Sequence, residues 1–310
     1  MGKGSGFGKV IVFGEHFIIY GAPGIVAPID LTTDATGTRR GDGKILIDDR
    51  RVGTPGYVES KREQQIESIE RMSRKAGLDG VGLDIDLGGA LPVFSGLGAS
   101  GASCVAFARA VSDEFGLGLS DAEINDLAHE GERAYHGEKT AGLDNLAATY
   151  GGLLRFEKGK PEDFECLAID HPVEVVIGNT GIVANSKAVI DGVGERRKTR
   201  KDEYDALAEQ AKTVGESGLQ ALVAGDVEEV GRLMNENHRL LQAIEVSCPE
   251  LDYLVDLAGK EGAIGAKQTG SGGGGCMLAL TPGADLQEKV ASAMERDGYA
   301  VLRARIGGAR

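Results

Sequence analysis

The chain has 310 residues, of which 41% are hydrophobic, so we expect one large or two medium globular domains with well-developed cores. Its 34 basic and 48 acidic residues leave a formal net charge of −14 at pH 7, which argues against nucleic acid as a partner. The four cysteines form no metal or disulfide pattern, and no apolar run has the length of a membrane span or a signal-peptide core, so a cytoplasmic protein without a membrane partner is expected.

Two short apolar runs near the start, residues 9–13 and 24–29, are predicted to be strands separated by a Gly-Ala-Pro-Gly turn. Glu15 and His16 stand side by side between them, ahead of an apolar run that ends at Tyr20. An acidic residue and a histidine at a strand end fit a pocket wall, but they also fit a capped strand end at the surface. The pair alone leaves both interpretations open.

Two further strands are predicted at residues 44–48 and 81–87, and the second has apolar residues at every other position. The charged segment between them, residues 59–76, has the spacing of a solvated helix with Ile66 and Ile69 on its inner face. This pattern of strands and helices favours a mixed α and β domain.

The stretch PVFSGLGASGASCVAFA, residues 92–108, runs from glycines and small residues into a segment of helical composition. Backbone N–H groups at such a helix start attract anions, because they are unpaired and lie at the positive end of the helix dipole. The stretch lacks the Gly-Lys-Ser/Thr of a Walker A loop and the strand context of a dinucleotide fingerprint. A phosphate-binding loop and a glycine-rich turn packed on a sheet both remain open.

A capping box formed by Ser120 and Glu123 opens a predicted helix that carries Glu132. The polar loop that follows, residues 137–145, holds the carboxylate of Asp144. Taken alone, an aspartate at this position is more often a helix cap than a catalytic residue.

The charged, proline-bracketed segment 157–172 is the best candidate for a linker, which divides the chain into domains 1–160 and 161–310. The elements predicted around it are strands, long helices, and a strand, glycine loop and strand in succession, at residues 153–156, 173–177, 199–224, 227–244, 250–261 and 264–280. The second domain is therefore expected to be a sheet covered by helical hairpins.

Three glycine-containing motifs stand in order at residues 8–21, 92–102 and 267–280, with Glu132 and Asp144 between the last two. Together they resemble the GHMP kinases over essentially the whole chain. The resemblance implies an α+β enzyme of two domains, the first like domain 2 of ribosomal protein S5 and the second a ferredoxin-like α/β sandwich. It also implies transfer of the γ-phosphoryl group of ATP, with Mg²⁺ as cofactor, to a hydroxyl of a small molecule.

Within this family, the first motif, GKVIVFGEHFIIYG, is most similar to that of archaeal-type mevalonate kinases, which implies (R)-mevalonate as acceptor at its 5-hydroxyl, in isoprenoid biosynthesis. Galactokinases carry Thr and Asp where Phe17 and Ile18 stand, and phosphomevalonate kinases tend to have Tyr in place of His16. Phosphomevalonate or a sugar as acceptor, a catalytically silent ligand sensor, and a nicotinamide-dependent oxidoreductase are the alternatives. A homodimer is common in the family.

The resemblance also implies roles for single residues. Asp144 would orient the acceptor hydroxyl and take its proton, Lys9 would keep Asp144 ionised, and Ser100 and Glu132 would bind Mg²⁺. The implied ATP-binding residues are Pro92, Ser95, Gly96, Leu97, Gly98, Ala99, Ser100, Gly101 and Ala102. The implied substrate-binding residues are Glu15, His16, Tyr20, Asp144, Gly270, Ser271 and Gly272, with Ser186 in a supporting position.

Overall fold

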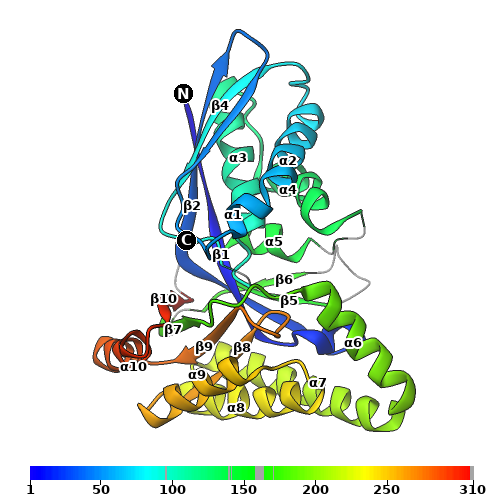
Figure 1. The fold of residues 1–310 in the computed structure, drawn as a ribbon, viewed down its shortest axis with the longest axis vertical. Coiled ribbons are helices and arrows are strands. Elements are labelled where there is room, and N and C mark those ends of the chain that lie inside the picture. The colour runs from blue at the N-terminus through cyan, green and yellow to red at the C-terminus, as the bar shows by residue number, and fades with distance from the viewer. Residues whose placement is uncertain (95, 139, 141, 158–163, 170, 308–310) are drawn as a thin grey trace. The chain divides into compact units, whose positions relative to one another are not determined.

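The computed structural model describes residues 1–94, 96–138, 140, 142–157, 164–169 and 171–307 (Figure 1). The chain forms two compact units, and neither is one continuous stretch. Unit 1 comprises residues 1–9, 29–93 and 98–151, and unit 2 comprises residues 10–28, 94–97 and 152–310. The division into independent domains at residue 160 stays a prediction.

The sheet of unit 1 is built by β1, β2, β3 and β4, and the first two of these strands continue into unit 2. The strands span Gly2–Phe13, Gly24–Arg40, Ile45–Asp49 and Gly82–Gly88. β4 lies between β3, which is parallel to it, and β2, which is antiparallel to it. The alternate residues Leu83, Ile85 and Leu87 of β4 are buried, which confirms the predicted period of two.

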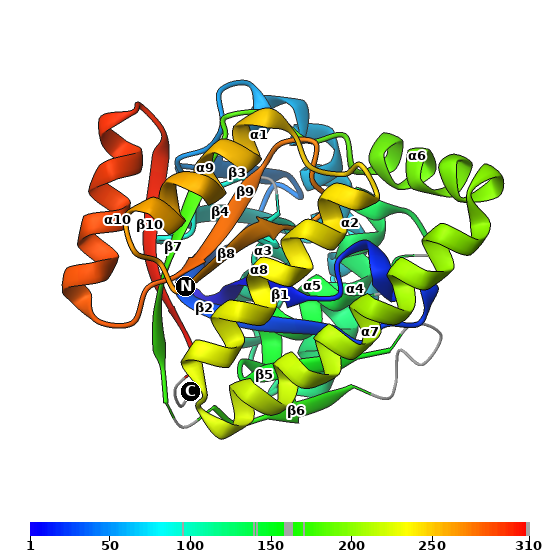
Figure 2. The same cartoon turned by 90° about the horizontal axis from the view of Figure 1, so that it is seen from below.

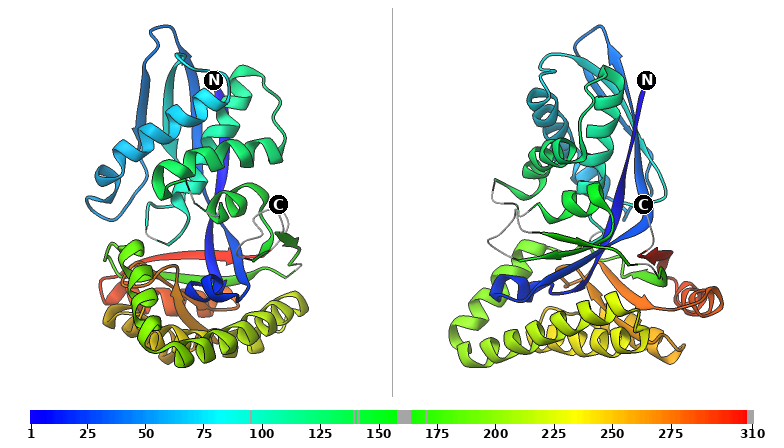
Figure 3. Two further views of the ribbon diagram at one scale, coloured as in Figure 1. Left: turned by 90° about the vertical axis from the view of Figure 1, so that its right-hand side faces the viewer. Right: turned by 180° about the vertical axis from the view of Figure 1, so that it is seen from behind.

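Helices α2, α3 and α4 cover one face of this sheet (Figure 3). The helices of unit 1 are α1 (Tyr57–Ser60), α2 (Arg62–Lys75), α3 (Ala99–Phe115), α4 (Asp121–His136) and α5 (Leu143–Tyr150). The predicted capping box of Ser120 and Glu123 is present at the start of α4. Ile69 of α2 is buried as expected, but Ile66 is 37% exposed, because the inward face of α2 runs through residues 65, 68, 69 and 72.

A row of glycines brings β1 into direct contact with α3. A Cβ atom at Gly2, Gly4 or Gly6 would lie 2.1, 2.1 or 2.4 Å from a backbone carbonyl oxygen of α3. Alternate residues of a strand share one face, so the three glycines form a smooth surface on which α3 rests. This contact fixes the helix that begins at the predicted phosphate loop.

The central sheet of unit 2 contains β10, β7, β9 and β8 in that order, with antiparallel neighbours throughout. The strands of unit 2 are β5 (Leu153–Phe156), β6 (Glu165–Leu167), β7 (Val173–Asn179), β8 (Gly265–Thr269), β9 (Cys276–Leu280) and β10 (Ala300–Ile306). β6 lies inside the segment 157–172, which was expected to be a linker, and it pairs with β5 just before that segment. Much of the segment lies outside the described residues.

The helices of unit 2 confirm the predicted helical segments and add two. They are α6 (Ser186–Thr199), α7 (Lys201–Ala224), α8 (Val227–Ala243), α9 (Pro249–Lys260) and α10 (Ala284–Arg296). α7 and α8 run side by side across the unit, and the apolar side chains of α9 and α10 pack on the sheet (Figure 2). α6 and α10 were not predicted. In the part of the chain that the structure describes, no helix combines the length and apolar character that crossing a membrane requires.

Candidate active site

The N-terminus of α3 forms the end of the second motif in unit 1. Gly98 precedes the helix with φ 67°, and no side chain caps the first turn. The N–H of Ala102 already donates to the carbonyl of Gly98, at 3.0 Å, so the backbone N–H groups just before it point out of the helix start. A terminus of this kind is able to bind an anion, and whether this loop does so stays a prediction.

Lys9 and Asp144 form an ion pair beside this helix start. The Nζ of Lys9 lies 3.3 Å from Oδ1 of Asp144, and their side chains are 6% and 24% exposed. Two glycines make the arrangement possible, because a Cβ atom at Gly98 would meet the Lys9 side chain at 2.9 Å and one at Gly101 would meet the Asp144 backbone at 2.6 Å. Asp144 lies in the first turn of α5, where the sequence predicted only a polar loop.

Glu132, His136, Asp144 and Ser100 surround a common point in unit 1, and with Lys9 we call them the phosphate-loop cluster. One ligand atom each of Glu132, His136 and Asp144 lies within 4.8 Å of the others, so the group could hold a metal ion. The Nε2 of His136 is 3.5 Å from the Ser100 hydroxyl and 3.6 Å from the Glu132 carboxylate. No role was predicted for His136, although its position four residues after Glu132 on a helix places both on one face.

The two carboxyl groups of the cluster have pKa values that move in opposite directions. Burial and the neighbouring Asp144 raise the pKa of Glu132 to about 8, against weaker opposing effects of Ser100 and Lys9. Burial would also raise the pKa of Asp144, but the charges of Lys9 and His136 together outweigh it and hold that pKa below its ordinary value. Lys9 and His136 thus favour the ionised form of Asp144, whereas burial favours the protonated form of Glu132.

A buried ion pair between Arg51 and Asp49 contacts α3 and was not predicted. Arg51 and Asp49 are 2.7 Å apart with side chains 4% and 3% exposed. Arg51 also donates to the Ser103 hydroxyl at 2.6 Å, and Ser103 donates to the carbonyl of Ala99 at 2.7 Å. Arg51, through Ser103, therefore holds the first turn of α3 in place, so the backbone N–H groups at the helix start are preorganised.

The two glycine loops meet within unit 2. Gly96 of the second motif is so close to the third motif that a Cβ atom on it would lie 3.1 Å from the Thr269 carbonyl. A Cβ atom on Gly270 would lie 3.2 Å from the Cα atom of Gly96. Ser95, also predicted to bind ATP, lies outside the described residues.

His16 and Ser186 both contact Ser271 of the third loop, Gly270–Gly275. The Nε2 of His16 donates to the Ser271 carbonyl at 2.7 Å, and the hydroxyls of Ser186 and Ser271 are 2.8 Å apart. Burial lowers the pKa of His16, although the Ser271 carbonyl and Glu15 act in the opposite direction. The ring is therefore neutral, and its buried Nδ1 is left as an acceptor with no partner among the described residues.

Glu15 is fully enclosed. Its carboxylate pairs with Lys267 of β8 and accepts a hydrogen bond from the Asn237 amide at 3.0 Å, and the side chains of Glu15 and Lys267 are both 0% exposed. The prediction that Glu15 contacts substrate is untested, but its oxygens already have partners in this structure. The role of Lys267 was not predicted, since nothing local in the sequence relates it to a residue 252 positions away.

Tyr20 lies at the end of the short helix His16–Tyr20, and the guanidinium of Arg197 lies 4.8 Å from the centre of its ring. The cation stacks on the aromatic face and fixes the ring's orientation. His16, Tyr20, Ser186 and Ser271 all lie in unit 2, and we call them the acceptor-side cluster.

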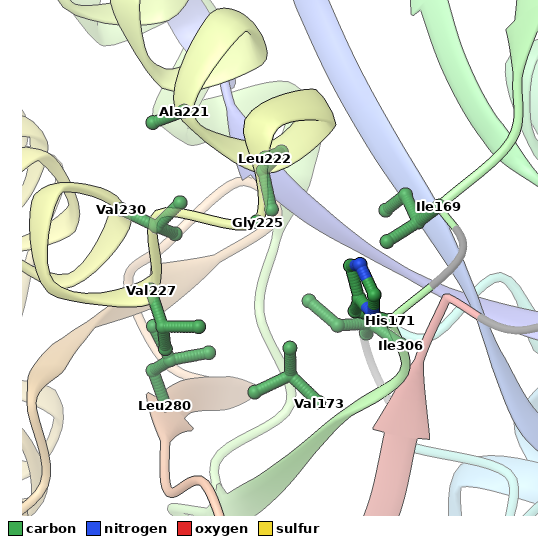
Figure 4. Close-up of a pocket in the computed structure, with 10 residues that line it drawn as sticks. All are labelled: Ile169, His171, Val173, Ala221, Leu222, Gly225, Val227, Val230, Leu280 and Ile306. Carbon is green, nitrogen blue, oxygen red and sulfur yellow. The ribbon is translucent and has the colours of Figure 1, made fainter.

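A separate apolar pocket in unit 2 encloses about 330 Å³ of space, part of it open to solvent (Figure 4). It is lined by Ile169, His171, Val173, Ala221, Leu222, Gly225, Val227, Val230, Leu280 and Ile306. None of the described lining residues carries a carboxylate or a hydroxyl, so they offer nothing for phosphoryl transfer, and the candidate site residues are those of the phosphate-loop cluster of unit 1 and of the acceptor-side cluster of unit 2.

Comparison with known proteins identifies the family of the chain. Residues 65–152 match the family model for the GHMP kinases N-terminal domain, and residues 219–300 match the model for the GHMP kinases C-terminal region. The mevalonate kinase of Pyrococcus horikoshii is 36% identical over 94% of this chain and 91% of its own length, and that of Thermococcus gammatolerans is 34% identical over 92% and 90%. The crystal structure of L. major mevalonate kinase in complex with R-mevalonate is 35% identical, covers 100% of this chain and 97% of its own, and superposes with a TM-score of 0.94. The chain belongs to the GHMP kinase family of ATP-dependent phosphotransferases and, within it, to the mevalonate kinases.

Proposed function

We propose that the enzyme transfers the γ-phosphoryl group of ATP to the 5-hydroxyl of (R)-mevalonate, giving 5-phosphomevalonate and ADP for isoprenoid biosynthesis in the cytoplasm. The observation that carries the proposal is the pair of Lys9 and Asp144, whose charged atoms lie 3.3 Å apart beside the uncapped start of α3. Phosphoryl transfer needs a positioned proton acceptor next to a phosphate-binding loop, and this pair supplies it.

Asp144 orients the acceptor hydroxyl and receives its proton as the bond to phosphorus forms. Lys9 has two effects: its charge keeps Asp144 ionised at neutral pH, and it stabilises negative charge at the reacting oxygen. The backbone N–H groups of residues 99–101 bind the phosphates of ATP, where the positive end of α3 offsets part of their charge.

Ser100 and Glu132 fit Mg²⁺ as ligands. Glu132 is 1% exposed and its pKa is raised to about 8, which indicates a buried carboxylate without a sufficient counter-charge. A hydroxyl and a carboxylate are the hard oxygen donors that Mg²⁺ prefers, and the ion would neutralise charge on the ATP phosphates. Asp144 lies close enough to bind the same ion, but its contact with Lys9 favours the role of proton acceptor.

His16 is proposed to bind a hydroxyl of the acceptor rather than its carboxylate. Its neutral ring donates from Nε2 to the Ser271 carbonyl, which leaves Nδ1 as an acceptor. A lone-pair nitrogen accepts from an O–H group but repels a carboxylate oxygen. Tyr20, Gly270 and Gly272 would shape the remainder of this side of the site.

The test measures ATP consumption by the purified protein with Mg²⁺ and, separately, mevalonate, phosphomevalonate, galactose and homoserine, with products identified by mass. We expect turnover with mevalonate alone and a product heavier by one phosphoryl group. Turnover with another acceptor instead would reassign the substrate, and silence with all four would favour a ligand sensor.

Asp144→Asn tests the proton acceptor. We expect kcat to fall by about 10²- to 10⁴-fold, while the KM for ATP changes little, because the amide keeps the shape but cannot take a proton. Asp126→Asn, on the exposed face of α4, makes the same charge change and is expected to leave kcat unaltered. Normal turnover of Asp144→Asn would remove this residue from the catalytic role.

A further inference from the structure

The turn after α8 contains an unusual backbone conformation in unit 2. Glu245 is the one non-glycine residue with positive φ in the described part of the chain, at 61°. Its N–H donates to the Gln242 carbonyl at 2.9 Å, and the next N–H, of Val246, donates to Leu241 at 3.2 Å. Glycine is the usual residue at such a helix end, because a Cβ atom is strained there. Keeping glutamate at this position requires contacts that compensate the strain.

Two arginines provide these contacts. Arg196 of α6 donates through Nη2 to the carbonyls of Ile244 and Glu245, at 2.8 and 3.2 Å. Arg200 donates to the Glu245 carboxylate at 2.5 Å. Both arginines also bond the hydroxyl of Tyr204, which is 2% exposed. The planar guanidinium of Arg196 thus binds two successive carbonyls through Nη2 and the Tyr204 hydroxyl through Nε, which fixes the direction of the chain through the turn.

The turn at Glu245 and Val246 contacts the third glycine loop and holds it in place. The carbonyl of Val246 accepts the N–H of Gly273 at 2.8 Å, and Val246 is 1% exposed. A Cβ atom on Gly272 would lie 2.0 Å from the same oxygen, so the loop approaches the turn at van der Waals limits. Any rotation of the Val246 carbonyl would therefore move the loop.

The loop carries the acceptor-side contacts described above. Ser271 binds His16 through its carbonyl and Ser186 through its hydroxyl. Ser186 begins α6, so this helix reaches the loop directly at its first turn and indirectly, through Arg196 and the turn, at its last.

We propose that Arg196 is a positioning residue for the acceptor side of the site: it holds the Glu245 turn in its left-handed conformation, and the turn fixes the third glycine loop beneath His16. The effect on the acceptor rests on the proposed function, whereas the effect on the loop does not. The alternative role for Arg196, whose charge contributes to lowering the pKa of His16, is direct attraction of an anionic acceptor.

The experiment measures hydrogen exchange of the peptide that contains Gly270–Cys276 in the protein without substrates. Arg196→Gln is expected to accelerate exchange there by roughly tenfold, the factor that corresponds to the left-handed preference of one residue. Adding Glu245→Gly to Arg196→Gln should restore the wild-type rate, because glycine adopts the turn without help. Arg232→Gln, an exposed arginine of α8 with partners on its own helix, is the matched control and should leave exchange unchanged.

The kinetic arm follows the same variants. Arg196→Gln should raise the KM for mevalonate with little change in the KM for ATP, and the double variant should restore the wild-type KM for mevalonate.

Unchanged exchange in Arg196→Gln, or a double variant that exchanges as fast as the single one, overturns the proposal. A double variant whose loop is restored but whose KM is not would favour direct attraction instead. If wild type is silent with mevalonate, the proposed function fails while the exchange result still decides the positioning role. Should Arg196→Gln not fold, Arg196→Lys keeps the charge, loses the planar fork, and has the same expected outcomes.

Discussion

Single residues in the phosphate-loop cluster have properties that only their neighbours explain. Glu132 is buried and Asp144 is partly buried, yet the pKa of Asp144 is lowered and that of Glu132 is raised. The difference follows from the charges of Lys9, whose Nζ lies 3.3 Å from Asp144, and of His136. A pair of like groups with divergent pKa values is the arrangement from which acid, base and ligand roles arise.

Lys9→Met is expected to lower kcat by about 10²- to 10³-fold, the cost of removing one preorganised charge from the reacting centre. Because Lys9 holds the pKa of Asp144 down, its loss should also move the acidic limb of the kcat profile to higher pH. The profile of Lys3→Met, an exposed lysine of the same strand, serves as control. An acidic limb that stays in place would show that Lys9 does not set the ionisation of Asp144.

Glu132→Gln tests the raised pKa through stability. The folded protein holds a proton on Glu132 up to a pH of about 8, whereas the unfolded chain releases it near 4.5, so the free energy of unfolding contributed by this group falls as pH rises between these values. Glutamine has no such dependence. Without divalent cations, the melting temperature of the variant relative to wild type should therefore rise by roughly a few degrees from pH 5 to pH 8. A constant difference would mean that Glu132 is already ionised in the folded state.

The candidate site was predictable from sequence as far as its residues lie in recognisable motifs. Lys9, Ser100, Glu132 and Asp144 were each singled out, and the structure brings them together in unit 1. The ion pair between Glu15 and Lys267 was not predictable, because the partner of a buried carboxylate depends on contacts between residues far apart in the sequence, which no local pattern indicates.

Among the elements, α3 and α5 determine where the catalytic groups lie. Their crossing is close because Gly101 of α3 has no side chain, and a Cβ atom there would lie 2.6 Å from the Asp144 backbone. Strong periodicity made most helices predictable, including α7, α8 and α9. The short α5, the polar α6 and α10 were missed. In α6 only Val193 is buried, so the helix has no apolar stripe that would reveal it.

Gly101→Ala should separate α3 from α5. We expect a loss of about 1–3 kcal/mol in the free energy of unfolding, as for other overpacked sites, and a lower kcat because Asp144 moves away from Lys9. Gly259→Ala in α9 is the control, since nothing lies within 4 Å of the added atom. Alanine should stabilise that helix by about 0.5–1 kcal/mol. Chemical denaturation measures both, and equal stability of Gly101→Ala and wild type would contradict the close crossing.

At the scale of the whole molecule, the chain enters and leaves each unit several times. Residues 10–28 belong to unit 2 although they lie near the start of the sequence, and they bring Glu15 to Lys267. Sequence order alone suggested two consecutive domains, because composition marks a boundary only where it changes along the chain.

Separate fragments 1–160 and 161–310 are therefore expected not to fold. The second fragment would leave Lys267, 0% exposed in the intact chain, without Glu15, and breaking such a buried pair costs about 3–5 kcal/mol. Circular dichroism and the dispersion of amide resonances of fragment 161–310 provide the measurement. Lys267→Met in the same fragment removes the uncompensated charge and should recover part of the structure. A well-dispersed spectrum from the unaltered fragment would show that residues 161–310 are an independent domain.

The glycine row of β1 also constrains how this protein can evolve. Gly2, Gly4 and Gly6 each face a carbonyl of α3 at a distance that excludes a Cβ atom. Every single-base change that replaces glycine introduces either a residue with a Cβ atom or a stop. These three positions therefore accept only synonymous changes, and amino-acid drift in this strand among relatives of this chain should be confined to the residues between them.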